Sequence, residues 1–169
     1  MRRSLCTLFP LICILAACGP KQTASQGTST ELITSCKKTD FADTLALCTT
    51  LIASGKISGM DLAIAFSDRG DAYTQSADFD HAIADFDHAI ELAPEYALAF
   101  GGRAAAYVGK EDYEHAVEDY NQAVMLDRNY ALAFYLRGMA KLALCDIEGG
   151  EIDINTARSL DPNVGLTPP

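Results

Sequence analysis

The sequence has no tryptophan and is short of basic residues. Its 169 residues include 13 Lys and Arg against 23 Asp and Glu, which gives a formal net charge of −10 at pH 7. A nucleic-acid partner needs a basic face to meet its phosphates, so this class of ligand is not expected. The excess of negative charge is typical of a solvated acidic surface, and a specific basic partner is the alternative.

A recognisable catalytic or metal-binding arrangement is also missing. No Ser stands in the Gly-x-Ser-x-Gly context of a nucleophile elbow. The three His residues, His81, His88 and His115, lie among Asp residues in stretches expected to face solvent, and metal binding by them is the weaker alternative. We therefore expect an interaction protein that is not an enzyme, with no metal and no cofactor.

Long apolar runs are absent except near the N-terminus. Arg2 and Arg3 precede the run Leu5–Ala17, which Pro10 interrupts. This run is too short for a stable transmembrane helix, and its basic start and small-residue end are typical of a signal peptide. We predict that residues 1–17 are a targeting segment and no part of the fold.

The end of this run is similar to a bacterial lipobox, through Leu15, Ala16, Ala17 and Cys18. The resemblance implies cleavage before Cys18 and a covalent lipid on its sulfur, and several acyl chains hold a protein firmly at a membrane. An ordinary secretory signal with an incidental Cys is the alternative. Gly19 stands where Asp would favour the inner membrane in this family, so we expect an envelope lipoprotein at the outer membrane, facing the periplasm.

Residues 18–30 are small and polar and show no periodicity. This composition is typical of a flexible tether, with a root-mean-square length of roughly 20 Å. We therefore expect the folded part to lie near the membrane without being pressed against it.

Residues 31–58 are predicted to form an N-terminal helical cap, as a degenerate pair of helices. An apolar stripe at helical spacing supports this prediction, and it consists of Phe41, Leu45, Cys48 and Ile52. Gly55 is expected to end the stripe. Ser58, followed three residues later by Asp61, is expected to cap the next helix.

Three of the six Cys lie beyond the lipobox, namely Cys36, Cys48 and Cys145. A secreted protein meets an oxidising compartment, so Cys36 and Cys48 are predicted to form a disulfide that contributes about 3 kcal/mol. Two reduced, buried thiols are the alternative, and Cys145 is either buried or available for another pairing. No two of the three have the Cys-x-x-Cys spacing of metal or redox sites.

The strongest pattern is a repeat with a step of 34 residues. So many matching columns at a fixed step indicate a repeat architecture. The columns include Phe66, Phe100 and Phe134; Arg69, Arg103 and Arg137; Asp85, Asp119 and Asp153; and Ala89, Ala123 and Ala157. The array is predicted over residues 59–164, in units 63–96, 97–130 and 131–164, with a loose tail at 165–169.

Each unit is predicted to hold two helices, at 63–76 and 79–92 in the first unit. Apolar residues fall on one face of each helix, and a short turn around Ala77 and Asp78 joins the two. Small residues such as Gly70 let the two backbones approach while aromatic side chains fill the space beside them. The predicted fold class is therefore an all-α solenoid of three helical hairpins.

These units closely resemble the tetratricopeptide repeat. The first unit meets its pattern in full with Phe66, Gly70, Tyr73, Ala82, Phe86, Ala89 and Pro94. The second departs at Arg128, where Pro is usual, and the third has Lys141 for Tyr and Gly150 for Ala. We expect looser packing in the third unit. Its last helix also carries Glu151 and Arg158 in place of Ile or Val, as a terminal repeat does.

The Arg and Asp columns predict a structural ion pair that occurs three times, within or between units. Such half-buried pairs favour a defined geometry more than they add stability. Use of the Arg side chains for ligand binding is the alternative. The predicted pairs are Arg69–Asp85, Arg103–Asp119 and Arg137–Asp153.

The resemblance also implies a concave surface, lined by the first helices, that takes extended peptides or partner helices. The family's clamp for a C-terminal carboxylate is not expected, because Ser67, Asp71, Gly102, Leu132 and Leu136 stand at its positions. An apolar helix or strand is the expected ligand, and the alternative is that part of the groove is core between units. The predicted lining is Ser67, Asp71, Thr74, Leu98, Gly101, Ala105, Val108, Leu132, Tyr135, Met139 and Leu142.

We therefore predict a membrane-tethered adaptor that presents this groove to another envelope protein or to a peptide segment. The alternative is a structural subunit of an envelope complex that uses its convex or end faces, or that forms a homo-oligomer. Repeat arrays of this kind serve many systems, so the fold alone names neither the partner nor the pathway.

Overall fold

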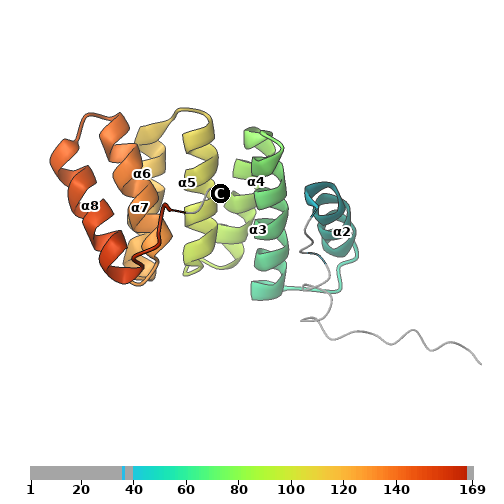
Figure 1. Cartoon of the computed structure of the whole chain (residues 1–169). Helices are drawn as coiled ribbons and strands as arrows, with labels where there is room; N and C mark the ends of the chain where they lie inside the picture. The colour runs from blue at the N-terminus through green and yellow to red at the C-terminus, as the bar shows by residue number, and fades with distance from the viewer. Residues whose placement is uncertain (1–35, 37–39, 167–169) are drawn as a thin grey trace, which may run out of the picture.

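A computed structural model describes Cys36 and residues 40–166 of the chain. Within these residues the secondary structure is entirely helical, and the helices stand side by side in a row of antiparallel pairs (Figure 1). The predicted all-α solenoid is confirmed. The helices are α2 Phe41–Ala53, α3 Gly59–Gln75, α4 Phe79–Leu92, α5 Ala97–Gly109, α6 Tyr113–Leu126, α7 Ala131–Ala143 and α8 Ile147–Leu160.

Three hairpins, α3–α4, α5–α6 and α7–α8, make up the array. Each helix packs against the next one along the chain, and in addition α3 packs against α5 and α5 against α7. The first helices of successive units therefore form one continuous layer. This layer is the concave side on which the sequence places the groove.

The turn inside each hairpin has the same construction in all three units. A residue with a left-handed backbone ends the first helix, at Ala77, Glu111 and Cys145, with φ values of 59°, 61° and 63°. The next residue is always an Asp whose carboxylate accepts a hydrogen bond from a backbone N–H in the first turn of the second helix. Such an N-cap satisfies a donor that has no partner inside the helix, and this fixes where α4, α6 and α8 begin.

The seam between the first two units is built around one aromatic ring. Phe86 on α4 is fully buried and touches both neighbouring first helices. A Cβ added at Gly70 would lie 2.9 Å from its ring, and one added at Gly102 would overlap the same ring. The two glycines therefore leave the space that Phe86 fills, so the small residues matter here for packing.

The backbones of the third unit approach closely at one point, and the expectation of looser packing in this unit stays a prediction. Gly138 on α7 faces Gly150 on α8, and a Cβ at Gly138 would lie 2.8 Å from the carbonyl oxygen of Gly150. The two backbones approach closely because neither residue has a side chain at this point. Lys141, which replaces the usual Tyr, places its Nζ 2.8 Å from an oxygen of Asp153.

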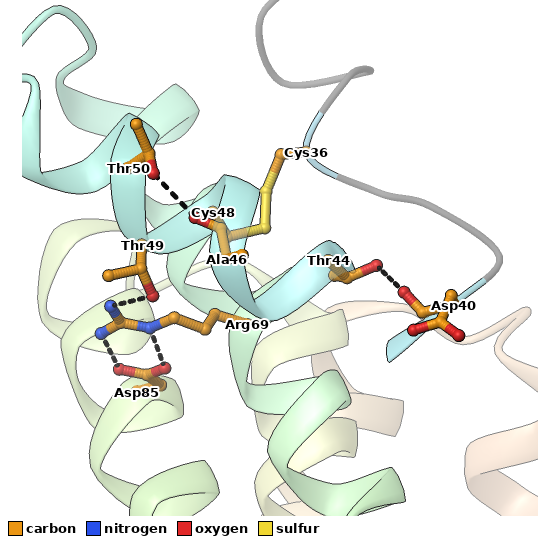
Figure 2. The surroundings of a disulfide bond; sticks show 9 residues. All are labelled: Cys36, Asp40, Thr44, Ala46, Cys48, Thr49, Thr50, Arg69 and Asp85. Atoms are coloured by element: carbon orange, nitrogen blue, oxygen red, sulfur yellow. Dashed lines mark hydrogen bonds and ion pairs between the residues drawn. A yellow bond between two sulfur atoms is a disulfide. The ribbon is translucent and has the colours of Figure 1, made fainter. Parts of the chain in front are cut away.

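The N-terminal end is closed by α2 and a disulfide (Figure 2). Cys36 and Cys48 are bonded with their Cα atoms 4.9 Å apart, and their exposed fractions are 1% and 0%. They share a small core with Leu51, Ile57 and Ala65, so the bond joins the chain around Cys36 to the face that α2 turns towards α3.

Two details of this end differ from expectation or lie outside the described residues. Ser58 does precede α3, but its side chain makes no capping hydrogen bond, so the predicted capping box with Asp61 is wrong. Gly59, with a φ of 57°, begins the helix instead. The first helix of the predicted pair falls mostly on residues 31–39, of which only Cys36 is described, so the pair stays a prediction. Gly55 follows the end of α2, as expected.

Candidate functional site

A cavity of about 250 Å³ opens on the concave side of the array. Residues of α3, of α5 and of α7, with the turns that precede α5 and α7, form its walls. The lining is Ser67, Asp68, Asp71, Tyr96, Leu98, Gly101, Gly102, Ala105, Tyr130, Leu132 and Leu136. The middle of the predicted groove is therefore hollow and accessible.

Six of the predicted groove residues line this cavity, namely Ser67, Asp71, Leu98, Gly101, Ala105 and Leu132. The other five lie elsewhere on the array. Thr74 donates a hydrogen bond to the carbonyl oxygen of Gly70 at 3.0 Å, and Val108 packs against the core of the second unit. Leu142 packs where Gly150 leaves room on α8. Met139 is 46% exposed and is not part of the cavity wall.

Tyr135 packs against the segment that follows α8. Gly165 has a φ of 76°, and a Cβ there would lie 2.5 Å from the ring of Tyr135. Val164 is buried, and its N–H donates to the carbonyl oxygen of Asp161 at 3.1 Å. This segment turns back over α7 (Figure 1), so the first residue of the predicted tail contacts the array. Residues 167–169 lie outside the described residues.

Five lining residues are outside the predicted groove. Gly102 and Leu136 were named only as positions of the family's clamp, and Asp68, Tyr96 and Tyr130 were missed. Tyr96 and Tyr130 are 34 residues apart, so they are a further column of the repeat, and Val164 is its third member. Tyr96 and Tyr130 are the residues before α5 and α7, and the period alone could have revealed this column. Tyr130 lies over α5 because Gly101 has no Cβ: one added there would be 3.0 Å from the phenol oxygen.

The cavity is acidic. Two carboxylates, Asp68 and Asp71, are part of its wall, and no Lys, Arg or His is among its lining residues. Burial raises the pKa of Tyr96, against a hydrogen bond with Ser67 that lowers it, and the two carboxylates raise it further. Burial and the charge of Asp71 raise the pKa of Tyr130 in the same way. Both phenols therefore stay neutral at physiological pH.

The three Arg residues of the repeat lie outside this cavity and hold the helices of each unit together. Each guanidinium makes two hydrogen bonds to one carboxylate, as the Arg–Asp columns predicted. Each also lies over the Phe of its own first helix, at 5.2 to 5.7 Å from the ring centroid. The hydrogen bond to Asp85 raises the pKa of Arg69, although burial acts against it.

The remaining nitrogen of each guanidinium reaches back to the preceding helix layer. Arg103 contacts Asp87 on α4 and Arg137 contacts Asn121 on α6. In the same way, Arg69 Nη1 donates to Thr49 on α2 at 3.3 Å (Figure 2). Helix α2 therefore takes the place that the second helix of a preceding unit would have.

The described residues hold no group of three or more side chains able to bind a metal ion. His81 and His115 are exposed, and Nδ1 of each lies 2.8 Å from the Asp that caps its helix. Cys145 is exposed and is not in a disulfide. Across the described part of the chain, no helix has the length and apolar character needed to span a bilayer.

The repeat seen in the geometry is also found by comparison with known protein families. A model described as "TPR repeat" matches residues 105–144, and one described as "Tetratricopeptide repeat" matches residues 63–96. The second TPR of Spaghetti (RPAP3) is 32% identical over 59% of this chain and 92% of that chain, with a TM-score of 0.58. The chain belongs to the tetratricopeptide repeat family. No curated protein sequence matches it.

Several solved structures share the fold. The structure of Spaghetti (RPAP3) is described as bound to the HSP90 peptide SRMEEVD. The second TPR domain of human RPAP3, in complex with the HSP70 peptide SGPTIEEVD, is also 32% identical, over 61% of this chain and 86% of that chain, with a TM-score of 0.58. MamA is 17% identical over 83% of this chain and 82% of that chain, with a TM-score of 0.69, and it shares the fold alone.

Proposed function

We propose that this TPR protein is an adaptor that holds an extended peptide segment of another envelope protein in the cavity on its concave side. The observation that carries this proposal is the cavity itself, which opens between α3, α5 and α7 and is lined by polar, aromatic and aliphatic side chains. Peptide-binding grooves combine such features, because the backbone of the ligand needs polar contacts and its side chains need apolar ones.

The TPR relatives support a peptide as the ligand. Two of the similar structures are described as complexes with short peptides, from HSP90 and HSP70. TPR repeats typically serve as interaction modules and not as enzymes, which fits the role of adaptor. The sequence lacks the family's clamp for a C-terminal carboxylate, so we do not expect these particular peptides to bind here.

A photo-crosslinking residue placed at Leu132 would test the adaptor role in intact cells. Leu132 is 48% exposed and lines the cavity, whereas Met125 on α6 is 62% exposed and does not line it. The same crosslinker at Met125 is therefore the matched control. We expect one dominant partner to be captured from Leu132 and not from Met125. Capture from Met125 alone would contradict the groove as the binding surface.

A structural role in an envelope complex is the second candidate. Large apolar side chains are exposed away from the cavity, with Ile147 at 56%, Ile152 at 58% and Met125 at 62%. Exposed apolar residues of this size are often contact points for other proteins. Crosslinks from Met125 or Ile152 to a partner, or to a second copy of the chain, would favour this role.

We also propose that the array is held at the membrane by a lipid on Cys18. The support is the similarity of residues 15–18 to a lipobox, since these residues lie outside the described part of the chain. Metabolic labelling with a radioactive fatty acid should mark the intact protein and not the Cys18→Ser variant. Equal labelling of both forms would remove the anchor from the proposal and leave the groove unaffected.

A further inference from the structure

The cavity has a charge that the adaptor role by itself does not explain. Asp68 and Asp71 are three residues apart and so lie on one face of α3, where both line the cavity. Asp68 is only 6% exposed. Both carboxylates already have an interaction partner. A carboxylate has about four lone-pair sites, however, so it can accept hydrogen bonds from a ligand as well.

Two aromatic rings complement these carboxylates. Tyr96 and Tyr130 belong to the same repeat column and contribute to the same cavity. Neutral phenol rings attract a cation to their faces, by about 0.5–2 kcal/mol depending on how well the site is shielded from water. Carboxylates and aromatic faces around one small cavity are a combination suited to a positively charged group.

The rim of the cavity is aliphatic. Leu98 is 51% exposed, Leu132 is 48% exposed, and Leu136 is partly buried beside them. The side chains of Lys and Arg match a cavity with an aliphatic rim and an acidic wall, because each has an apolar stem and a charged end. The volume of about 250 Å³ is below the range of roughly 300–1,000 Å³ typical of small-molecule sites, so it suits one side chain.

The array's own repeat cations do not compete for this place. Arg69, Arg103 and Arg137 are each held by a carboxylate of the second helix, with hydrogen bonds to Asp85, Asp119 and Asp153. A positively charged ligand would therefore not have to displace any of these three cations from its carboxylate. The formal net charge of −10 favours the approach of such a ligand.

We propose that this cavity binds the Lys or Arg side chain of an extended peptide, with the stem between Leu98 and Leu132 and the charged end at Asp71. The inference rests on the adaptor function and names the chemistry of its ligand. It is the reverse of the acidic EEVD ends of the HSP90 and HSP70 peptides in the RPAP3 structures. It also replaces the purely apolar ligand that the sequence predicts.

An array of immobilised heptapeptides of random sequence, incubated with the full chain in detergent, would measure this preference. We expect Lys or Arg to be enriched at one position among the bound peptides, with an apolar residue beside it. The best peptide is then synthesised with Lys, norleucine or Glu at that position, and each Kd is measured by fluorescence anisotropy. We expect norleucine to weaken binding about tenfold and Glu to weaken it more.

Variants of Asp71 would connect the preference to the cavity. Asp71→Asn should raise the Kd of the Lys peptide about tenfold and leave the Kd of the norleucine peptide unchanged. Asp71→Lys should shift the preference towards the Glu peptide. Glu118→Gln is the matched control, because Glu118 is exposed on α6 and the change in charge is the same. Circular dichroism would show that each variant keeps its helices.

The outcomes separate the two proposals. The proposal of a cationic ligand would be overturned if the bound peptides showed no preference for Lys or Arg. It would also be overturned if Asp71→Asn weakened the binding of the Lys and norleucine peptides equally. Either result would leave the adaptor role standing. Absence of any peptide binding, together with crosslinks from Met125 alone, would overturn both. The three-peptide comparison uses the unmodified chain, so its result does not depend on the stability of a variant.

Discussion

The first two units and the third unit close the same kind of helical hairpin with different side chains. In the first two, a ring on the second helix fills the core, and Phe86 and Tyr120 are at most 1% exposed. In the third, the smaller Ile154 stands at this place and is only partly buried. Each inner unit is covered by a successor among the described residues, whereas no further helix covers α8 there.

The difference shows that the changes in the third unit compensate one another. The smaller core residue is matched by Gly138 and Gly150, which let α7 and α8 come closer than a pair of side chains would allow. The lost Tyr is matched by Lys141, which gives Asp153 a second cation beside Arg137. The third unit therefore joins its two helices through backbone approach and ion pairing, in place of aromatic burial.

Removal of the central side chain should have the largest effect. Phe86→Ala should lower the free energy of unfolding by about 3–5 kcal/mol, because it empties a fully buried space. Ile154→Ala should cost about 2 kcal/mol, at the low end for its type, since Ile154 is only partly buried. Urea denaturation followed by circular dichroism measures both. Equal losses would contradict the difference between the units.

Removal of the guanidinium should also separate the two regions. Arg103→Ala should cost about 3 kcal/mol, because it leaves Asp119 buried and without its Arg. Arg137→Ala should cost roughly 1–2 kcal/mol, because Lys141 still contacts Asp153. A Lys141→Ala background should bring the two costs together. If it does not, Lys141 is not the compensating cation.

A methyl group at the closest backbone approach should have a smaller effect. Gly138→Ala should destabilise the protein by about 1–2 kcal/mol, because the new Cβ meets the carbonyl oxygen of Gly150. The higher helix propensity of alanine offsets part of this loss. Thermal unfolding would measure it. Ala84→Gly, exposed in the interior of α4, should lose about 1 kcal/mol through propensity alone. A more stable Gly138→Ala variant would show that α7 can shift without cost.

The smallest effect should be in the pH dependence of the second unit. The hydrogen bond to Asp112 raises the pKa of His115, and Asp112→Ala should bring that pKa back down, as measured by NMR. Because the pKa is raised on folding, the stabilisation is present below about pH 6.5 and is lost as the pH rises through the folded value. The third unit has Gly149 at the equivalent position, so it contributes no such effect. A His115 pKa that does not respond to Asp112→Ala would contradict this origin.

The array could be predicted from the sequence because its period places chemically similar residues in the same contacts. The Arg and Asp columns are 16 residues apart in every unit, and this spacing brings them together across each hairpin. The packing of the third unit could not be predicted in the same way. Lys141 and Gly150 appear as two separate departures from the pattern, and only the fold shows that each has a compensating neighbour.

The cavity was predictable in position but not in chemistry. Positions on the first helices follow from the period, and six of the predicted groove residues line the cavity. Tyr96 and Tyr130 lie in the turns before those helices, where helical spacing gives no direction to a side chain. The place of Tyr130 over Gly101 depends on how closely two units stack, and the aromatic character of the cavity depends on the two tyrosines.

The disulfide at the N-terminal end has a mechanical consequence. A pull on the chain from the N-terminal side of Cys36 would pass through the sulfur atoms directly to Cys48, in the middle of α2. The residues between the two cysteines would carry none of that load. Because Cys48 is packed against the array and Arg69 joins α2 to α3 and α4, a tethered protein under tension would pull on the whole stack, and α2 would not unwind from its end.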